Sequence, residues 1–228
     1  MLKVNAVTKK FRELKANDNI SLTLSEGETG ILLGSNGAGK STLIKCICGL
    51  MNFEGSITVN GADCKSIEAK RLIGYVPETP ALYDYLTVEE HLEFIERSYK
   101  CKNEKLKNGL LELFELGDKR NKLGKELSKG MQQKLSICCA LIHEPKLIIF
   151  DEPMVGLDPY AIKTLKELFV KLREKGACIL ISTHIIDSVE GLWDRAFILS
   201  KGKLMAEKIS SDGGLEEAFF SITGEEKK

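Results

Sequence analysis

The sequence predicts an α/β fold, in which a parallel sheet is covered by helices and extended by an N-terminal antiparallel β subdomain and a helical insertion. Short apolar runs at residues 31–33, 147–150 and 178–181 are typical of strands buried on both faces. Alternating segments fill the first 60 residues, and helical periodicity without strand signals fills about 86–143. We expect one domain over 1–228, with its core in about 1–85 and 144–228 and a helical subdomain in about 86–143.

The N-terminal segments alternate apolar and polar side chains, as half-buried antiparallel strands do. The positions that we assign to shared apolar faces are Leu2, Val4 and Ala6, then Ile20, Leu22 and Leu24, then Ile57 and Val59. Asn60-Gly61 follows the third set directly and predicts a tight hairpin turn.

Capping residues mark the expected helices. Asp158, Pro159 and Gly176 delimit one helix between the last two apolar runs, and 87–90 form a capping box that opens another helix through about Lys100. Further helices are expected from about Lys40 to Leu50, around the apolar positions Leu106, Leu110, Leu113 and Phe114, and from Ser128 to Glu144. Trp193 is expected in the core, and the tail 224–228 is expected to fray.

Charge and hydropathy exclude several classes of protein. Lys plus Arg and Asp plus Glu both number 33, so the net charge of 0 argues against a nucleic-acid partner. No apolar run approaches the ~20 residues that a membrane span needs. The N-terminus lacks an apolar signal core, so we expect the chain to stay in the cytosol.

A phosphate-binding loop is the clearest motif. Residues 34–41 read Gly-Ser-Asn-Gly-Ala-Gly-Lys-Ser and match G-x-x-x-x-G-K-[ST] between an expected buried strand and an expected helix. Its glycines let backbone amides surround phosphate oxygens at a helix N-terminus. Lys40 is expected to reach the β- and γ-phosphates, and the Ser41 hydroxyl to ligate Mg²⁺.

Two carboxylates and a histidine follow the later apolar runs. Asp151 and Glu152 end the run at 147–150, at the same rim as the phosphate loop. We expect Asp151 on the Mg²⁺ side and Glu152 to activate water. His184 follows the run at 178–181 and can face the γ-phosphate from there.

A second capped helix start, at Ser128, has no nucleotide loop of its own. The segment Leu127-Ser128-Lys129-Gly130-Met131 would by itself be only a capped helix. Helix N-termini also bind phosphates, so this spare half-site suggests a site that another copy of the chain completes.

Together these motifs resemble the ATP-binding cassette (ABC) family over nearly the whole chain, and identify a P-loop NTPase core of the nucleotide-binding subunit of an ABC transporter. The resemblance implies ATP binding by Phe11 and by Gly34, Ser35, Asn36, Gly37, Ala38, Gly39, Lys40, Ser41 and Thr42. It implies a signature motif at Ser128, Lys129, Gly130 and Met131 that acts in trans, and a D-loop at Asp158. Glu152 and His184 would be catalytic, while Ser41, Glu78 of the Q-loop and Asp151 would hold Mg²⁺.

Two motifs depart from the family pattern. The signature has Lys129 and Met131 where the family usually has Gly and Gln, and Glu78 stands where the Q-loop has Gln. Such variants resemble export-type, ABC-2-like cassettes that pair with separate membrane subunits.

The resemblance implies an ATPase that uses ATP and Mg²⁺ to power transport, and it implies export rather than import. Its expected partners are a second nucleotide-binding subunit, identical or different, and an integral membrane permease that holds the chain on the cytoplasmic face of the membrane. The alternative within the family is a soluble ABC ATPase without a membrane subunit. Rivals outside it are a P-loop kinase and a nucleotide-gated binding module without turnover.

Residues 82–86 either pack the helical insertion or line a groove for a partner's helix.

Overall fold

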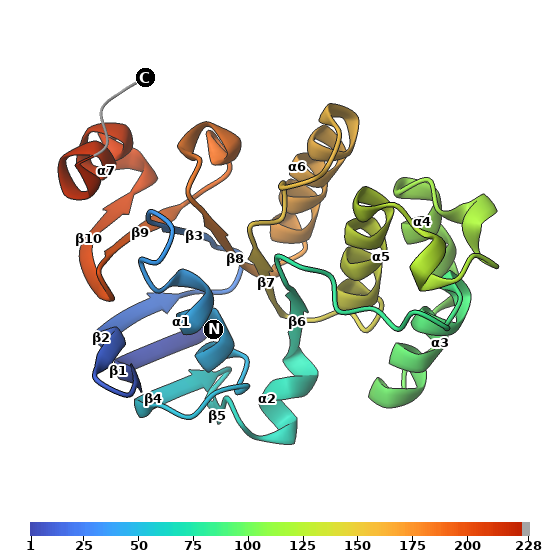
Figure 1. Ribbon diagram of the computed structural model, residues 1–228, viewed down its shortest axis with the longest axis horizontal. Coiled ribbons are helices and arrows are strands. Elements are labelled where there is room, and N and C mark those ends of the chain that lie inside the picture. The colour runs from blue at the N-terminus through green and yellow to red at the C-terminus, as the bar shows by residue number, and fades with distance from the viewer. Residues whose placement is uncertain (225–228) are drawn as a thin grey trace.

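The structure, a computed structural model, describes residues 1–224, apart from the side chain of Asp212. These residues form two β-sheets and seven α-helices (Figure 1). Apart from Gly224, the tail expected to fray lies outside the described residues. The antiparallel sheet has the order β2 (Leu14–Leu24), β1 (Leu2–Phe11), β4 (Glu54–Val59) and β5 (Ala62–Asp63). The larger sheet has the order β10 (Lys203–Ile209), β9 (Arg195–Ser200), β3 (Thr29–Leu33), β8 (Cys178–Thr183), β7 (Leu147–Asp151) and β6 (Ile73–Val76).

The helices are α1 (Lys40–Ile47), α2 (Ile67–Leu72), α3 (Val88–Tyr99), α4 (Glu104–Leu113), α5 (Lys129–Leu141), α6 (Pro159–Glu174) and α7 (Leu215–Thr223). Short 3₁₀ turns lie at Gly117–Lys119, Gly124–Glu126, Ile186–Val189 and Ser210–Asp212. The capping box of α3 and the Asp158 cap of α6 are present as predicted. α1 and α5 are each about one turn shorter at the C-terminal end than predicted. Among residues 1–224 no helix is long and apolar enough to cross a membrane.

The larger sheet confirms the α/β prediction. Its strands β9, β3, β8, β7 and β6 are parallel, and β10 adds an antiparallel edge. β3, β7 and β8 are the three apolar runs of the sequence, and every residue in them is buried. Parallel strands that are buried on both faces need no polar alternation, which explains their continuous apolar character.

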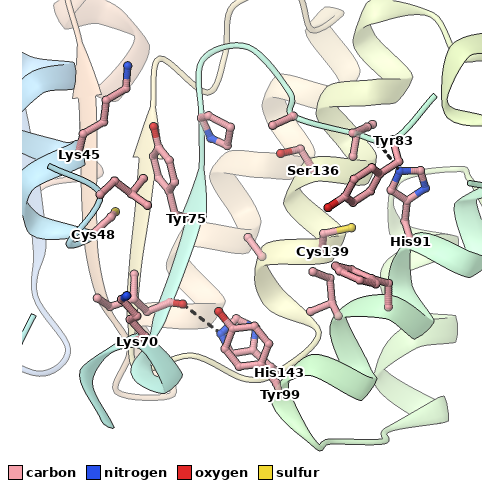
Figure 2. A pocket seen from close by; sticks show the side chains of 18 residues that line it. Lys45, Cys48, Lys70, Tyr75, Tyr83, His91, Tyr99, Ser136, Cys139 and His143 are labelled. Atoms are coloured by element: carbon pink, nitrogen blue, oxygen red, sulfur yellow. Dashed lines mark hydrogen bonds between the residues drawn. The ribbon is translucent and has the colours of Figure 1, made fainter. Parts of the chain in front are cut away.

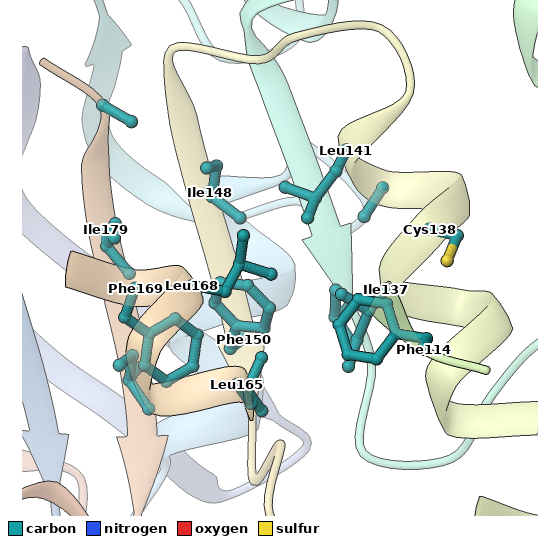
Figure 3. Packing of buried hydrophobic residues seen from close by; sticks show 14 of the residues in the cluster. Phe114, Ile137, Cys138, Leu141, Ile148, Phe150, Leu165, Leu168, Phe169 and Ile179 are labelled. Atoms are coloured by element: carbon teal, nitrogen blue, oxygen red, sulfur yellow. The ribbon is translucent and has the colours of Figure 1, made fainter. Parts of the chain in front are cut away.

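The two faces of this sheet belong to different hydrophobic clusters. Ile148 and Phe150 point towards α5 and α6, where Phe150 meets Phe169 edge to face at a centroid distance of 4.8 Å (Figure 3). Phe114, which follows α4, joins the same cluster, so the helices inserted between β6 and β7 share this core. Leu147 and its alternating neighbours point the other way, towards α1 and the antiparallel sheet. The division of the chain into one domain with a helical subdomain stays a prediction.

The antiparallel sheet contains one departure from the predicted pattern. The φ angles of Asn60 and Gly61 are +51° and +85°, as a tight hairpin turn requires. Ala6, however, does not share the apolar face of Leu2 and Val4: it is exposed, with φ +50°, at a bulge in β1, and Val7 is buried instead. One extra residue at a bulge reverses the side-chain alternation beyond it. Trp193 is half-buried at the edge of the core.

Candidate active site

The loop between β3 and α1 has a backbone that tolerates no side chain at two glycines. Gly39 has φ +105°, and a Cβ atom on it would lie 2.3 Å from the carbonyl oxygen of Ala16. A Cβ atom on Gly34 would lie 2.6 Å from the carbonyl oxygen of Leu199. α1 begins at Lys40, and no side chain caps its first amides. These amides, at the positive end of the helix dipole, are therefore available to an anion.

Lys40 lies under this loop and is almost completely buried, with 6% of its surface exposed. Its ammonium group donates to the carbonyl oxygen of Gly34 at 2.7 Å and pairs with Glu152 Oε1 at 3.4 Å. These two acceptors offset the desolvation of the buried charge. A phosphate group would offer the same ammonium a more highly charged partner.

Asp151 lies at the end of β7, where only 2% of its surface is exposed. Its Oδ1 accepts hydrogen bonds from the Ser41 hydroxyl of α1, at 3.1 Å, and from the Ser182 hydroxyl of β8. Strand pairing sets Asp151 directly opposite Ser182, while the phosphate loop brings Ser41. The predicted meeting of the loop and this carboxylate at one rim is thus present in the structure.

Glu152 connects the phosphate loop to the histidine. Its backbone is left-handed, with φ +48°, and its carboxylate is buried. The same oxygen that pairs with Lys40 lies 3.0 Å from Nδ1 of His184, which follows β8. Lys40, Glu152 and His184 therefore meet at a single carboxylate oxygen.

A cleft of about 820 Å³ opens over this cluster. Its lining contains the predicted residues Phe11, Asn36, Gly37, Ala38, Gly39, Lys40, Ser41, Thr42, Glu78, Glu152 and His184. Phe11, at the end of β1, is 44% exposed, as a ring that stacks on a flat ligand would be. Glu78 is exposed, and among the described contacts none joins it to Ser41 or Asp151.

Several residues that line the cleft were not predicted from the sequence: Leu14, Lys15, Ala16, Val155, Lys201 and Gly202. Lys201 and Gly202 form the turn between β9 and β10, and the Gly202 amide donates to the carbonyl oxygen of Ala38 at 3.1 Å. Ser200-Lys201-Gly202 reads as a hairpin turn in the sequence. Its place beside the phosphate loop follows only from β9 lying next to β3, which no local signal reveals.

The signature residues lie outside the cleft, and so does Asp158. Ser128 caps α5, and its hydroxyl accepts from the Met131 amide at 3.3 Å. A Cβ atom on Gly130 would lie 3.3 Å from the carbonyl oxygen of Gly156, so the signature segment lies against the loop that leads to α6. Ser128 and Lys129 are exposed. A hydrogen bond from the Ala161 amide lowers the pKa of Asp158, which stays ionised as the α6 cap.

The donors at the inner end of the cleft fit a magnesium ion. Mg²⁺ prefers oxygen ligands and is usually held by one or two carboxylates together with substrate phosphates. Ser41 Oγ and the Asp151 carboxylate, 3.1 Å apart, supply such oxygens beside the phosphate loop. No group of three or more His, Cys, Asp or Glu side chains within residues 1–224 could hold a metal ion alone.

Comparison with known proteins identifies the family. The family model described as "ABC transporter" matches residues 17–155, which include the phosphate loop, the signature segment and the Asp151-Glu152 pair. This chain belongs to the ABC transporter family, as an ATP-binding cassette.

Individual relatives and solved structures are similar to this chain along almost its full length. The ABC-type transporter ATP-binding protein EcsA of Bacillus subtilis (strain 168) is 36% identical over 241 aligned positions, covering 99% of this chain and 98% of EcsA. A solved ATP-binding subunit of an ABC transporter is 36% identical, with a TM-score of 0.89 over 96% of this chain and 94% of that one. A dimeric post-hydrolysis structure of the cassette MJ0796, bound to ADP and Pi, is 28% identical, with a TM-score of 0.81 over 92% and 98% of the two chains.

Proposed function

We propose that this chain hydrolyses ATP as the nucleotide-binding subunit of an ABC transporter. The observation that carries the proposal is the convergence of Lys40 and His184 on the Glu152 carboxylate, next to Asp151 and Ser41. A lysine for phosphate, oxygen ligands for a metal and a carboxylate for water are the parts that phosphoryl transfer to water requires.

Each residue has a role that its position supports. Phe11 stacks on the adenine ring, and the amides of the loop and of α1 hold the phosphates. Lys40 neutralises the β- and γ-phosphates. Glu152 accepts a proton from the attacking water, and His184 holds the γ-phosphate and the Glu152 carboxylate in line.

Ser41 and Asp151 are the residues that would hold Mg²⁺, with Glu78 as a further candidate at the edge of the cleft. When bound, Mg²⁺ neutralises charge on the phosphate oxygens. Glu78 has a carboxylate where the family pattern has an amide, so it would bring an additional negative charge and oxygen ligand to the metal.

We propose that two chains share each nucleotide; the similar cassette MJ0796, bound to ADP and Pi, is dimeric. Ser128, Lys129, Gly130 and Met131 lie outside this chain's own cleft, although a helix N-terminus suits a phosphate. In a dimer, this segment and Asp158 of one chain would close the cleft of the other. The second subunit is either the same chain or a related one.

A groove between the nucleotide-binding core and the inserted helices is a suitable place for a membrane subunit to dock. It has a volume of about 660 Å³ and lies between α1 and β6 on one side and α3 and α5 on the other (Figure 2). Tyr83 and Phe94 are 57% and 47% exposed at its rim, and the Tyr83 amide donates to His91 Nε2 at 2.9 Å. Leu82 lines the same groove and also packs against the core, so both interpretations of residues 82–86 made from the sequence stay open.

The partner that we propose for this groove is a helix of a separate integral membrane permease. The chain would then work on the cytoplasmic face of the membrane. Export is the proposed direction, because the Lys129, Met131 and Glu78 variants resemble export-type cassettes. A neighbouring reading frame with about six apolar spans, each of ~20 residues, would identify the permease.

The Glu152→Gln variant tests the hydrolytic function. It keeps the shape of the side chain but removes the charge, so we expect ATP binding to persist and turnover to fall by at least ~10²-fold, as for a lost general base. Loss of the charge also removes repulsion against the γ-phosphate, so a dimer should accumulate with ATP but not with ADP. Steady-state phosphate release and light scattering with each nucleotide measure these two effects. Normal turnover with a monomer in both nucleotides would contradict the proposal.

A further inference from the structure

Ser182 is a buried residue of the active site to which the family motifs give no role. It is the fifth residue of β8, between Leu32 of β3 and Asp151 of β7, and none of its surface is exposed. The predicted site includes only His184 from this segment. A polar side chain at the centre of a parallel sheet needs hydrogen-bond partners, and the partners of Ser182 are the two acidic residues of the site.

The single hydroxyl of Ser182 contacts both acids. The hydroxyl donates a hydrogen bond to Asp151 Oδ1 and accepts one from the Glu152 amide at 3.1 Å. The carbonyl oxygen of Ser182 accepts from the same amide at 3.2 Å. Ser182 thus orients the side chain of Asp151 and the backbone of Glu152 at once.

The hydrogen bonds to Asp151 are asymmetric. Ser182 and Ser41 both donate to Oδ1, and no described residue donates to Oδ2. The carboxylate is therefore held by one oxygen while the other keeps its lone pairs. Outer hydrogen bonds of this kind fix the direction in which a carboxylate offers its free oxygen to a metal.

The amide of Glu152 matters because the residue has left-handed backbone geometry. A φ of +48° is uncommon for a residue with a long side chain, and surrounding contacts must maintain it. The hydroxyl and carbonyl of Ser182 hold that amide from β8. The geometry directs the Glu152 carboxylate towards Lys40 and His184.

We propose that Ser182 is a positioning residue that aligns Asp151 for Mg²⁺ and Glu152 for water, an inference that rests on the proposed ATPase function. Ser182 does not line the cleft, so it would act through the two acids. A purely structural serine would affect only the stability of the fold. A positioning serine also affects how strongly Mg²⁺ increases the affinity for nucleotide.

Four chains test this: the wild type, Ser182→Ala, Ser182→Thr and Ser182→Val. Thr and Val have nearly the same shape and both suit a strand, so they share any cost of the added methyl group and differ mainly in the hydroxyl. Calorimetry measures the affinity for ADP with Mg²⁺ and with EDTA. Phosphate release gives kcat and KM for ATP, and thermal melting reports stability.

We expect the Ala and Val variants to bind ADP in EDTA like the wild type but to lose most of the increase in affinity that Mg²⁺ produces. Their kcat should fall by about 10- to 100-fold, as is typical when an outer partner of a metal ligand is removed, with a smaller change in KM. The Thr variant should retain more of the Mg²⁺-dependent increase in affinity, and a higher kcat, than the Val variant.

Two results would overturn the proposal: Mg²⁺ dependence and kcat that stay at the wild-type level in the Ala variant, or equal behaviour of Thr and Val. Failure of the proposed ATPase function would be distinct, because the wild type itself would then release no phosphate. In that case the ADP titrations still test the alignment of Asp151.

Discussion

At the scale of single residues, the candidate site is organised around one oxygen atom. Glu152 Oε1 pairs with Lys40 and lies within hydrogen-bond distance of His184. If Lys40 binds phosphate as proposed, its ammonium group would exchange at least part of this contact for phosphate oxygens. Its charge would then favour nucleotide binding, and the Glu152 carboxylate would oppose that contribution.

Replacing Lys40 by Ala should weaken the binding of ADP and ATP by about 10- to 100-fold, because a hydrogen bond to a charged group is worth ~1.5–3 kcal/mol. Lys45→Ala is the matched control: Lys45 lies on the same helix but lines the docking groove instead of the cleft. Calorimetric titration with both nucleotides measures the effect. An unchanged affinity in the Lys40 variant would remove this lysine from the site.

At the scale of elements, a buried ion-pair network joins the inserted helices. Lys107 of α4 has 4% of its side chain exposed and pairs with Glu89 of α3 at 2.8 Å. Arg120, which follows Gly117–Lys119, pairs with the same glutamate, also at 2.8 Å. Burial alone would raise the pKa of Glu89, but the hydrogen bonds and charges of Lys107 and Arg120 outweigh burial and lower it.

The Glu89→Gln variant should lose about 1–2 kcal/mol of stability at pH 7. The substitution replaces the charged carboxylate by a neutral amide, which weakens the hydrogen bonds from both Lys107 and Arg120. The folded pKa of Glu89 is lowered, so its stabilising contribution is complete above the ordinary value of 4.5 and is lost as the pH falls through the lowered pKa. The difference between variant and wild type should therefore shrink in acid. Urea unfolding at pH 7 and at successively lower pH values measures it.

Glu93→Gln on the same helix is the control for this comparison. Glu93 pairs with Arg97 at the surface, where their side chains are 43% and 81% exposed. Such pairs contribute only ~0.3–0.5 kcal/mol. Equal losses in the two variants would contradict the view that the Lys107 network, rather than surface charge, joins α3 and α4.

Local sequence signals were sufficient for most elements and for the inner part of the site. The apolar runs predicted β3, β7 and β8, and the residues that follow them predicted Lys40, Asp151, Glu152 and His184 at one rim. The position of Ala6 could not be predicted, because a bulge changes the alternation without a composition signal. Lys201 and Ser182 were missed for another reason: their neighbours in space come from strand order, which local patterns do not contain.

At the scale of the whole molecule, the residues proposed for one reaction lie on two separate surfaces. The cleft contains Lys40, Glu152 and His184, while the exposed Ser128 and the half-buried Gly130 lie at the start of α5, outside the cleft lining. A single chain would therefore bind nucleotide without using its signature segment. Two chains related by a twofold axis would form two equivalent sites, in which each chain's signature segment faces the other chain's cleft.

Complementation between two inactive variants tests this arrangement. Ser128→Arg should leave ADP binding intact and abolish turnover, because the arginine obstructs the phosphate contact of the other chain, whereas Ser56→Arg on β4 should be harmless. Lys40→Ala should also be nearly inactive, because it lacks the charge that is proposed to neutralise the γ-phosphate during transfer. A dimer with one chain of each kind contains one site in which both halves are intact: the cleft of the Ser128→Arg chain and the signature of the Lys40→Ala chain.

Random pairing of an equal mixture should therefore recover about a quarter of the wild-type rate if the two sites act independently. Phosphate release measured on each variant and on the mixture decides the matter, since a mixture no more active than its components would mean that each chain completes its own site.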